Sequence, residues 1–203
     1  MKKKIILIGM GGHASACIDV LENNNYELFG FIDNKIKKDD FHKLKYLGKD
    51  KDLENIIKLN PNLFCIISFG NHKLIKKRTQ IFKKIREYGY SFEAVISKTS
   101  YIAKKSFIND GTIIMNHVVI NIGVSIGKNC IINTGSIVDH NSTIDDNCII
   151  STNVTINGDV HIGEGTFIGS GAIISNDITI GSGSVIGAGV VIKKSLPNNS
   201  ILK

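Results

Sequence analysis

The stretch Ile126-Gly-Lys-Asn-Cys-Ile-Ile132-Asn-Thr-Gly-Ser-Ile-Val138-Asp-His-Asn-Ser-Thr-Ile144 carries an aliphatic residue at every sixth position. The same spacing holds without exception from Ile96 to Ile192. Four residues after each of these aliphatic positions, from Ser100 to Val190, the side chain is small, and only Ile178 departs from that rule. Neither an α-helix nor a plain alternating strand produces this period.

A coil of short strands does produce it. If three hexapeptides form one triangular turn, residues 18 apart stack directly above one another, as Cys130 and Cys148 would. The large aliphatic residue then points into the prism and the small residue lies near a corner. We therefore predict that residues 96–203 form a parallel β-helix, with its tight bends at the Gly and Asn positions Gly127, Asn133, Asn157, Gly163, Gly169, Gly181 and Gly187.

The first half of the chain, residues 1–95, has the pattern of a small α/β domain. Residues 4–9 and 28–33 read as strands on either side of a helix over 11–21, which is a βαβ opening. Residues 64–70 supply a third strand, and residues 72–88 supply a second long helix. We expect a Rossmann-like domain with three strands.

A glycine motif follows the first strand. Gly9-x-Gly11-x-x-Ala14 fits the relaxed dinucleotide fingerprint, and Asp33 lies where the ribose-binding acid of that fingerprint would be. However, about 95 residues provide only one mononucleotide half. What remains is a glycine turn at a helix N-terminus, which suits a phosphate. This favours a nucleotide or nucleotide-sugar site, with a purely structural turn and NAD chemistry as alternatives.

Charge and composition narrow the class of protein. The formal charge is +7, and residues 1–95 carry all of this excess, much of it within residues 35–51. We expect that segment to be a solvated, mobile loop; it has no interleaved stacking aromatics, so no nucleic-acid partner is expected, although its charge could attract an anionic substrate. No membrane insertion and no signal sequence are expected, so we predict a cytoplasmic protein with four unpaired, buried cysteines.

Several motifs together carry a family resemblance. Gly11-Gly12-His13, Phe31-Ile32-Asp33, Phe69-Gly70-Asn71 and Asn133-Thr134-Gly135-Ser136-x-x-Asp139-His140 resemble bacterial hexapeptide-repeat sugar acetyltransferases. These include nucleotide-sugar N-acetyltransferases of surface-polysaccharide biosynthesis and sialic acid O-acetyltransferases. The resemblance covers nearly the whole chain.

The resemblance implies a left-handed β-helix, a homotrimer, and acetyl-CoA bound in the groove between neighbouring subunits. It also implies that His140 is the catalytic base, with Asn141 beside it, and that residues at or near Ser170 and Ala188 line the coenzyme groove. The nucleotide sugar would be held in the first domain by residues such as Gly11, Gly12, His13, Asp33, Asn34 and Gly70.

The chemistry suits a histidine at position 140. An amine or hydroxyl that attacks a thioester must lose a proton, and neutral imidazole is able to take it. His140 follows the inward-pointing Val138 by two residues, so we expect it near a corner and facing the groove; the alternative is an ordinary surface histidine at a turn. The family commonly has a carboxylate directly after this histidine, whereas this chain has Asn141, so the base is weaker than usual or another acid approaches it.

Two further histidine positions bear on the prediction. Ile149 replaces a histidine that contacts the coenzyme in some relatives. His117, His140 and His161 fall at different phases of the repeat and lack paired spacing, so no metal site is expected.

We therefore predict an acetyl-CoA-dependent N-acetyltransferase that acts on the amino group of a nucleotide-linked amino-dideoxy sugar. The alternative in the same class is O-acetylation of a sialic acid or a related sugar. A non-catalytic hexapeptide scaffold that binds a partner is the alternative from another class, since hexapeptide helices also serve such roles.

Overall fold

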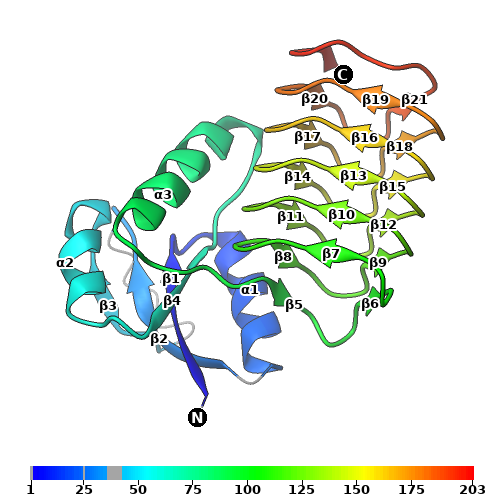
Figure 1. Cartoon of the computed structure of the whole chain (residues 1–203). Helices are drawn as coiled ribbons and strands as arrows, with labels where there is room; N and C mark the ends of the chain where they lie inside the picture. The colour runs from blue at the N-terminus through cyan, green and yellow to red at the C-terminus, as the bar shows by residue number, and fades with distance from the viewer. Residues whose placement is uncertain (1, 25, 36–42) are drawn as a thin grey trace.

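The computed structural model describes residues 2–24, 26–35 and 43–203. It contains a small α/β domain followed by a left-handed parallel β-helix, as the repeat and the resemblance predicted (Figure 1). No helix within these ranges combines the length and hydropathy needed to cross a bilayer.

The α/β domain has a four-stranded parallel sheet in the order β3-β2-β1-β4. Apolar side chains on both faces of the sheet bury it between two helical layers. Helix α1 packs on one face, and α2 and α3 pack on the other. The elements are β1 (Lys3–Ile8), α1 (Gly12–Glu22), β2 (Tyr26–Ile32), β3 (Tyr46–Gly48), η2 (Asp50–Asp52), α2 (Leu53–Lys58), β4 (Leu63–Ile67), η3 (His72–Leu74) and α3 (Ile75–Glu87).

This domain departs from the sequence prediction in two places. Strand β3 lies within the lysine-rich segment that we expected to be a loop, and it pairs in parallel with β2. Residues 36–42 of that segment lie outside the described residues. The short helix α2 was also missed, although Leu53 and Ile57 are buried in the core. Both elements are short and depend on tertiary packing more than on a local pattern.

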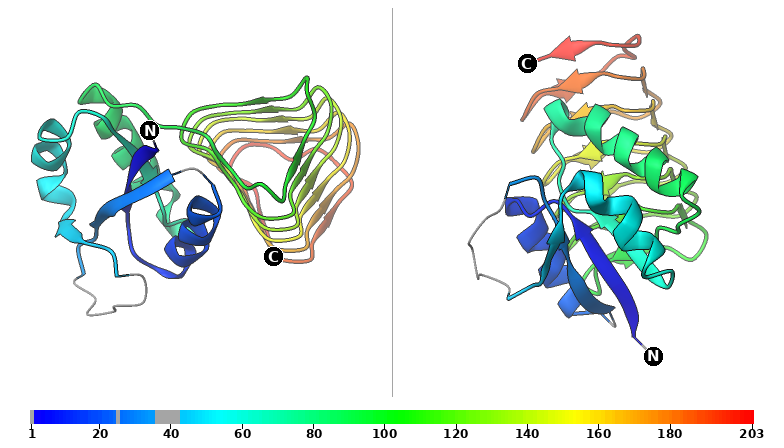
Figure 2. Two further views of the ribbon diagram at one scale, coloured as in Figure 1. Left: turned by 90° about the horizontal axis from the view of Figure 1, so that it is seen from below. Right: turned by 90° about the vertical axis from the view of Figure 1, so that its left-hand side faces the viewer.

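The β-helix consists of three parallel sheets that run along the three sides of a triangular prism (Figure 2, left). The domain-facing sheet contains β5 (Val95–Ile96), β8 (Ile113–Ile114), β11 (Ile131–Ile132), β14 (Ile149–Ile150), β17 (Phe167–Ile168), β20 (Val185–Ile186) and β22 (Ile201–Leu202). The second, the β6–β21 sheet, contains β6 (Tyr101–Ile102), β9 (Val119–Ile120), β12 (Ile137–Val138), β15 (Thr155–Ile156), β18 (Ile173–Ile174) and β21 (Val191–Ile192). The third, the β7–β19 sheet, contains β7 (Phe107–Ile108), β10 (Ser125–Ile126), β13 (Thr143–Ile144), β16 (His161–Ile162) and β19 (Thr179–Ile180).

The register between coils confirms the 18-residue stacking. Ile132 pairs with Ile150, and Val138 pairs with Ile156. The aliphatic residues at six-residue spacing fill the prism together with the small residues four positions later. Cys130 and Cys148 belong to this core, and all four cysteines are free and buried. Burying one of the large aliphatic side chains contributes about 1.5–3 kcal/mol, so the stacked residues stabilise every coil.

The corners differ from the prediction in one respect. Positive φ angles occur three residues after the aliphatic position, for example at Asn141 (57°) and Gly135 (72°), where Gly, Asn and Asp are tolerated best. The glycines that we expected at the bends lie one residue after the aliphatic position. A Cβ at Gly169 would lie 2.6 Å from the backbone nitrogen of Ala188 in the next coil, so glycine serves close packing there.

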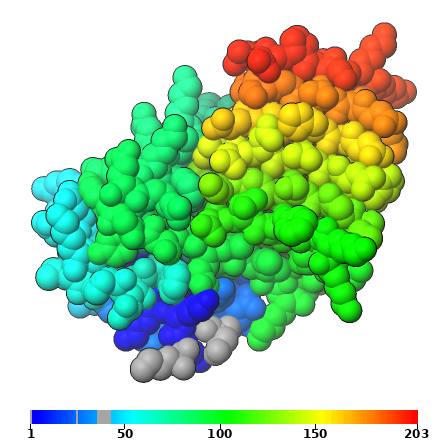
Figure 3. All heavy atoms as spheres, viewed as in Figure 1, coloured from blue at the N-terminus to red at the C-terminus, as the bar shows by residue number. Residues whose placement is uncertain are grey.

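The α/β domain covers one side of the prism only. On the domain-facing sheet, the outward side chains of Ile113, Ile131 and Ile149 are almost completely buried. Ile113 packs in one cluster with α1, and His72 stands against Phe167 with ring centroids 5.5 Å apart. The space-filling view shows the two parts in continuous contact (Figure 3). The other two sides of the prism therefore remain uncovered in one chain.

Candidate active site

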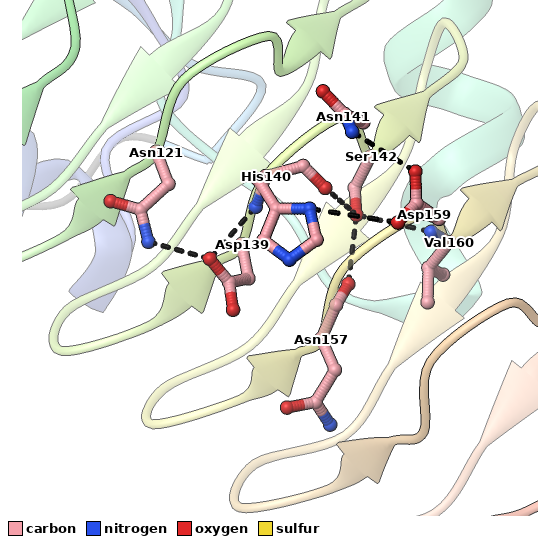
Figure 4. Close-up of polar contacts among 8 residues, drawn as sticks. All are labelled: Asn121, Asp139, His140, Asn141, Ser142, Asn157, Asp159 and Val160. Carbon is pink, nitrogen blue, oxygen red and sulfur yellow. Dashed lines mark hydrogen bonds and ion pairs between the residues drawn. The ribbon is translucent and has the colours of Figure 1, made fainter.

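His140 lies at the corner that joins β12 to β13, between the β6–β21 and β7–β19 sheets (Figure 4). Its side chain is 46% exposed, so the ring is on the surface as predicted and not in the prism. Its backbone carbonyl accepts a hydrogen bond from the Asp159 N–H at 3.0 Å, which ties this corner to the next coil. The position is open to a substrate from outside the β-helix.

A carboxylate from the next coil approaches the ring. Asp159 stacks 18 residues after Asn141, and its Oδ2 lies 3.5 Å from His140 Nδ1. Its Oδ1 accepts a hydrogen bond of 3.1 Å from the Asn141 side-chain amide. The acid that is missing beside His140 in the sequence is therefore present in space.

Asp139, the carboxylate directly before His140, contacts the backbone of the corner. Its Oδ1 accepts hydrogen bonds from the His140 backbone N–H and from the Asn121 side chain, both at 2.8 Å. These bonds stabilise the ionised form, and they lower the pKa of Asp139, the bond from His140 N–H having the larger effect. Asp139 thus stabilises the corner backbone and does not contact the ring, as expected from the alternation of side chains along a strand.

A second candidate site lies in the α/β domain, where a cavity of about 380 Å³ opens at the carboxyl ends of β1, β2 and β4. In the sheet, β2 lies on one side of β1 and β4 lies on its other side. The carboxyl ends of these strands therefore form the topological switch point, where such folds bind ligands. The volume is that of a small-molecule pocket. Its lining residues are Gly9, Met10, Gly11, Asp33, Asn34, Lys35, Asp50, Phe69, Leu74 and Lys77.

The polar groups of the cavity are partly paired with each other. Asp33 Oδ2 accepts a hydrogen bond from the Met10 backbone N–H at 2.7 Å, and its Oδ1 accepts one from Lys35 N–H at 2.8 Å. Asp33 thereby holds the glycine turn against the end of β2, besides facing the cavity. Lys77 pairs with Asp50 at 3.0 Å, so the wall carries both charges.

The glycine turn leaves space at the start of α1. The N-cap residue Gly11 makes no side-chain cap, and a Cβ at Gly11 or Gly12 would meet no atom within 4 Å. The first N–H groups of α1 are therefore accessible to an anion. This is the feature of the fingerprint that the structure retains.

Other predicted substrate residues lie elsewhere. Gly70 does not line the cavity, because it lies against the β-helix, where a Cβ would be 2.4 Å from Ile131 Cδ1. His13 lies close to the charge of Arg78, and its buried Nε2 has no hydrogen-bond partner among the residues that the structure describes. Burial, aided by the charge of Arg78, lowers the pKa of His13 from 6.5 to about 4. Ile149, the second departure from the family pattern, is buried at the junction of the two domains.

The lowered pKa of His13 makes the stability of the fold depend on pH. Between about pH 6.5 and pH 4 the unfolded chain protonates His13 while the folded chain does not, so stability falls as the pH falls through this window. The expected loss is at most about 3 kcal/mol. Urea unfolding at pH 7 and pH 4.5 should show a smaller acid loss for His13→Gln than for the wild type, and equal losses would contradict this assignment.

The two residues predicted to line the coenzyme groove, Ser170 and Ala188, are exposed and stacked on successive coils. They lie at the corner between the domain-facing sheet and the β6–β21 sheet, just before β18 and β21. His140 lies at the opposite edge of that β6–β21 sheet. A single chain therefore does not bring these residues together.

Sequence reasoning missed Asp159, Gly158 and the cavity residues Asp50 and Lys77. The sequence does contain the signal for Asp159 and Gly158, because the 18-residue stacking places them next to Asn141 and His140 on the following coil. Asp50 lies just after β3 and Lys77 lies on α3. These two segments come together only in the tertiary fold, so no local pattern predicts the contact. Across the described part of the chain, no three His, Cys, Asp or Glu side chains are grouped closely enough to hold a metal ion.

Comparison with protein-family models assigns both parts of the chain. Residues 4–85 match the PglD N-terminal domain, residues 116–140 match the hexapeptide repeat of succinyl-transferase, and residues 159–194 match the six-repeat bacterial transferase hexapeptide. These matches assign residues 4–85 to the PglD N-terminal domain and the two later segments to transferase hexapeptide repeats. The family resemblance predicted from the sequence is confirmed at this level. The cavity at the carboxyl ends of the strands lies within the PglD-type domain, and His140 lies at the end of a matched repeat.

Two solved structures resemble nearly the whole chain, and one curated relative resembles about half of it. The acetyltransferase domain of PglB from Neisseria gonorrhoeae is 27% identical, with a TM-score of 0.91 over 98% of this chain and 96% of that one, and it has also been solved with acetyl coenzyme A. PerB from Caulobacter crescentus, in complex with CoA and GDP-perosamine, is 27% identical, with a TM-score of 0.88 over 98% of this chain and 92% of that one. UDP-N-acetylbacillosamine N-acetyltransferase of Bacillus subtilis is 29% identical over 114 residues, which are 56% of this chain and 51% of that protein.

Proposed function

We propose that this protein transfers the acetyl group of acetyl-CoA to the amino group of a nucleotide-linked amino-dideoxy sugar, with His140 as general base. The observation that carries the proposal is the likeness over nearly the whole chain to a solved protein that holds CoA and GDP-perosamine. The accessible N-terminus of α1, at the edge of a cavity of about 380 Å³, supports a nucleotide phosphate in the first domain. Acetyl-CoA as co-substrate and the four free cysteines favour a cytoplasmic location.

The reaction needs one proton acceptor that later becomes a donor. The amine lone pair attacks the thioester carbonyl carbon and forms the C–N bond, while the amine proton moves to the imidazole of His140. The C–S bond then breaks with its electron pair on sulfur, and the imidazolium returns the proton to give the free thiol of CoA. The ring of His140 is exposed at the surface of the β-helix, so it is accessible to a bound substrate for both proton transfers.

We further propose that the site forms between copies of the chain in a homotrimer. His140 stands at the vertex of the prism opposite the side that the α/β domain covers, so the cavity of the same chain is on the far side. The β6–β21 sheet, which ends at the His140 corner, presents an apolar outer face on which Ile137, Ile173 and Val191 are 39%, 40% and 49% exposed. This row of exposed apolar side chains, interrupted by Thr155 between Ile137 and Ile173, is suited to contact another chain.

If this face forms the trimer interface, one charge introduced there should strongly weaken assembly of the trimer. Ile173→Glu should convert a trimer into monomers in light scattering and lower acetyl transfer at the same time, because a carboxylate would be desolvated in the interface. Thr179→Glu on the outer face of the β7–β19 sheet provides the matched control and should leave both properties unchanged. A wild-type protein that is monomeric yet fully active, or an Ile173→Glu variant that remains trimeric, would contradict the proposal.

The activity is tested by free-thiol release from acetyl-CoA with a panel of UDP-, dTDP-, GDP- and CMP-linked amino sugars. We expect thiol release only with a nucleotide-linked amino sugar, and mass spectrometry should locate the acetyl group on nitrogen. Release with a free sialic acid would indicate O-acetylation instead. A protein that binds neither CoA nor any nucleotide in calorimetry would be a scaffold, and the proposed enzyme function would be wrong.

A further inference from the structure

The corner that carries His140 is built from a ladder of residues on successive coils. Gly123, Asn141, Asp159 and Asp177 occupy the same corner position, and all four have a positive φ near 55–80°. Because they stack, a side chain at this position can reach the residue on the next coil, as Asn141 reaches Asp159. Asn141 uses its amide to hold Asp159 Oδ1 at 3.1 Å, which leaves Oδ2 directed at His140 Nδ1 (Figure 4).

The ring of His140 also has a defined position against the next coil of the β-helix. It lies over Gly158, where a Cβ would be only 2.3 Å from Cε1 and 2.5 Å from Nε2. Gly158 has no positive φ, so its backbone does not require glycine. The absence of a side chain at position 158 is instead what allows the ring to lie flat on the next coil, beside Asp159.

Among the described residues, Asp159 is the carboxylate that pairs with the His140 ring. Asp139 is engaged by the His140 backbone N–H and by Asn121. The 3.5 Å separation of Nδ1 and Oδ2 is longer than a hydrogen bond, but both side chains are about half exposed and free to move the remaining few tenths of an ångström. Catalytic hydrogen bonds are often long before a substrate binds and shorten in the complex.

We propose that Asp159, from the coil after His140, is the positioning carboxylate of the active site and that Gly158 is the seat of the ring. This inference rests on the proposed acetyltransferase function. Asp159 accepts a hydrogen bond from Nδ1–H of neutral His140, so Nε2 carries the lone pair that takes the proton of the attacking amine. Asp159 remains ionised throughout and stabilises the imidazolium that forms. The ladder thus supplies across two coils the acid that Asn141 does not provide.

The matched variants are Asp159→Asn and Asp177→Asn, because both change the same corner position and only the first lies beside His140. Asp159→Asn should lower kcat by about 10- to 100-fold, the usual effect of removing such a partner, with little change in the KM for acetyl-CoA. Asp177→Asn should retain full kcat. Thermal unfolding of both variants separates this effect from a loss of fold.

A relocation variant gives the sharper test. In the Asp159→Asn background, Asn141→Asp puts a carboxylate directly after His140, at a φ of 57° that Asp tolerates. We expect it to restore most of the lost kcat, which a merely structural role of Asp159 would not allow. Gly158→Ala should displace the ring and lower kcat by a similar 10- to 100-fold while the chain stays folded.

The outcomes separate the two proposals. If the wild type transfers no acetyl group, the proposed function fails. If the wild type is active, His140→Ala is inactive and Asp159→Asn retains full kcat, only the role of Asp159 is wrong. An equal loss in Asp159→Asn and Asp177→Asn, or a folded double variant without recovery, would also overturn the inference.

Discussion

Replacing His140 with alanine is expected to lower kcat for acetyl transfer by about 10²- to 10⁴-fold, the usual contribution of a general base. The side chain is half exposed and, within residues 2–24, 26–35 and 43–203, pairs only with Asp159 at 3.5 Å, so its removal leaves the prism core and the coil register intact. The KM for both substrates should change little. Thiol release under saturating substrates gives kcat, and light scattering together with thermal unfolding verifies that the assembly persists.

His161→Ala provides the matched control for this experiment. His161 also lies on the β-helix and also faces a carboxylate, with Nε2 3.0 Å from Asp145 Oδ2, but it projects from the middle of the β7–β19 sheet and not from the His140 corner. Its removal should leave kcat unchanged. Equal activity of the His140→Ala variant and the wild type would eliminate the proposed mechanism, whereas equal losses in both variants would point to a general effect on the β-helix.

The sequence predicted the β-helix in detail because every coil repeats one environment. Once Ile126, Ile132 and Val138 are placed in the prism, the 18-residue stacking assigns the coil neighbours of every later residue. The same rule would have found Asp159 and Gly158. Because Asn141 and Asp159 are 18 residues apart, the acid that is absent at position 141 stacks beside it on the next coil.

The α/β domain was less predictable because its elements depend on each other. Strand β3 has three residues and forms by pairing with β2, and no local pattern distinguishes it from a loop. Gly70 belongs to a family motif, yet its closest neighbour is Ile131 of the β-helix, a contact that arises only when the two domains meet. Contacts between distant segments are what a single sequence does not reveal.

The junction between the domains depends on one buried cation that sequence analysis did not identify as special. Arg78, on α3, is 1% exposed and faces no carboxylate within the described residues. Its Nη1 donates to the carbonyl of Ile67 and, at 3.0 Å, to that of Phe69, while its Nε donates to the carbonyl of Asn129 at 3.2 Å. Burial lowers the pKa of Arg78 to about 10, so it stays charged at neutral pH.

These contacts join three segments: α3, the end of β4, and the β-helix corner at Asn129. The carbonyls of Ile67 and Phe69 lie three residues and one residue before Gly70, which packs against Ile131, so the arginine also holds the strand end that approaches the β-helix. Lysine cannot replace it, because one ammonium group at the end of a flexible stem does not reproduce the planar fork that reaches three carbonyls.

Arg78→Ala is therefore expected to destabilise the protein by roughly 3 to 5 kcal/mol, since buried carbonyls lose their donor and a cavity remains between the domains. For a chain of this size the melting temperature should fall by on the order of 10 °C at fixed protein concentration. Arg78→Lys should recover only part of this loss. Arg86→Ala tests the same helix on its exposed side, where the ion pair with Asp110 at 3.4 Å contributes at most about 1 kcal/mol. Equal melting temperatures for Arg78→Ala and Arg86→Ala would contradict this prediction. They would mean that apolar packing alone stabilises the junction. The hydrogen bonds of Arg78 to the carbonyls would then do no more than offset the free energy needed to bury its charge.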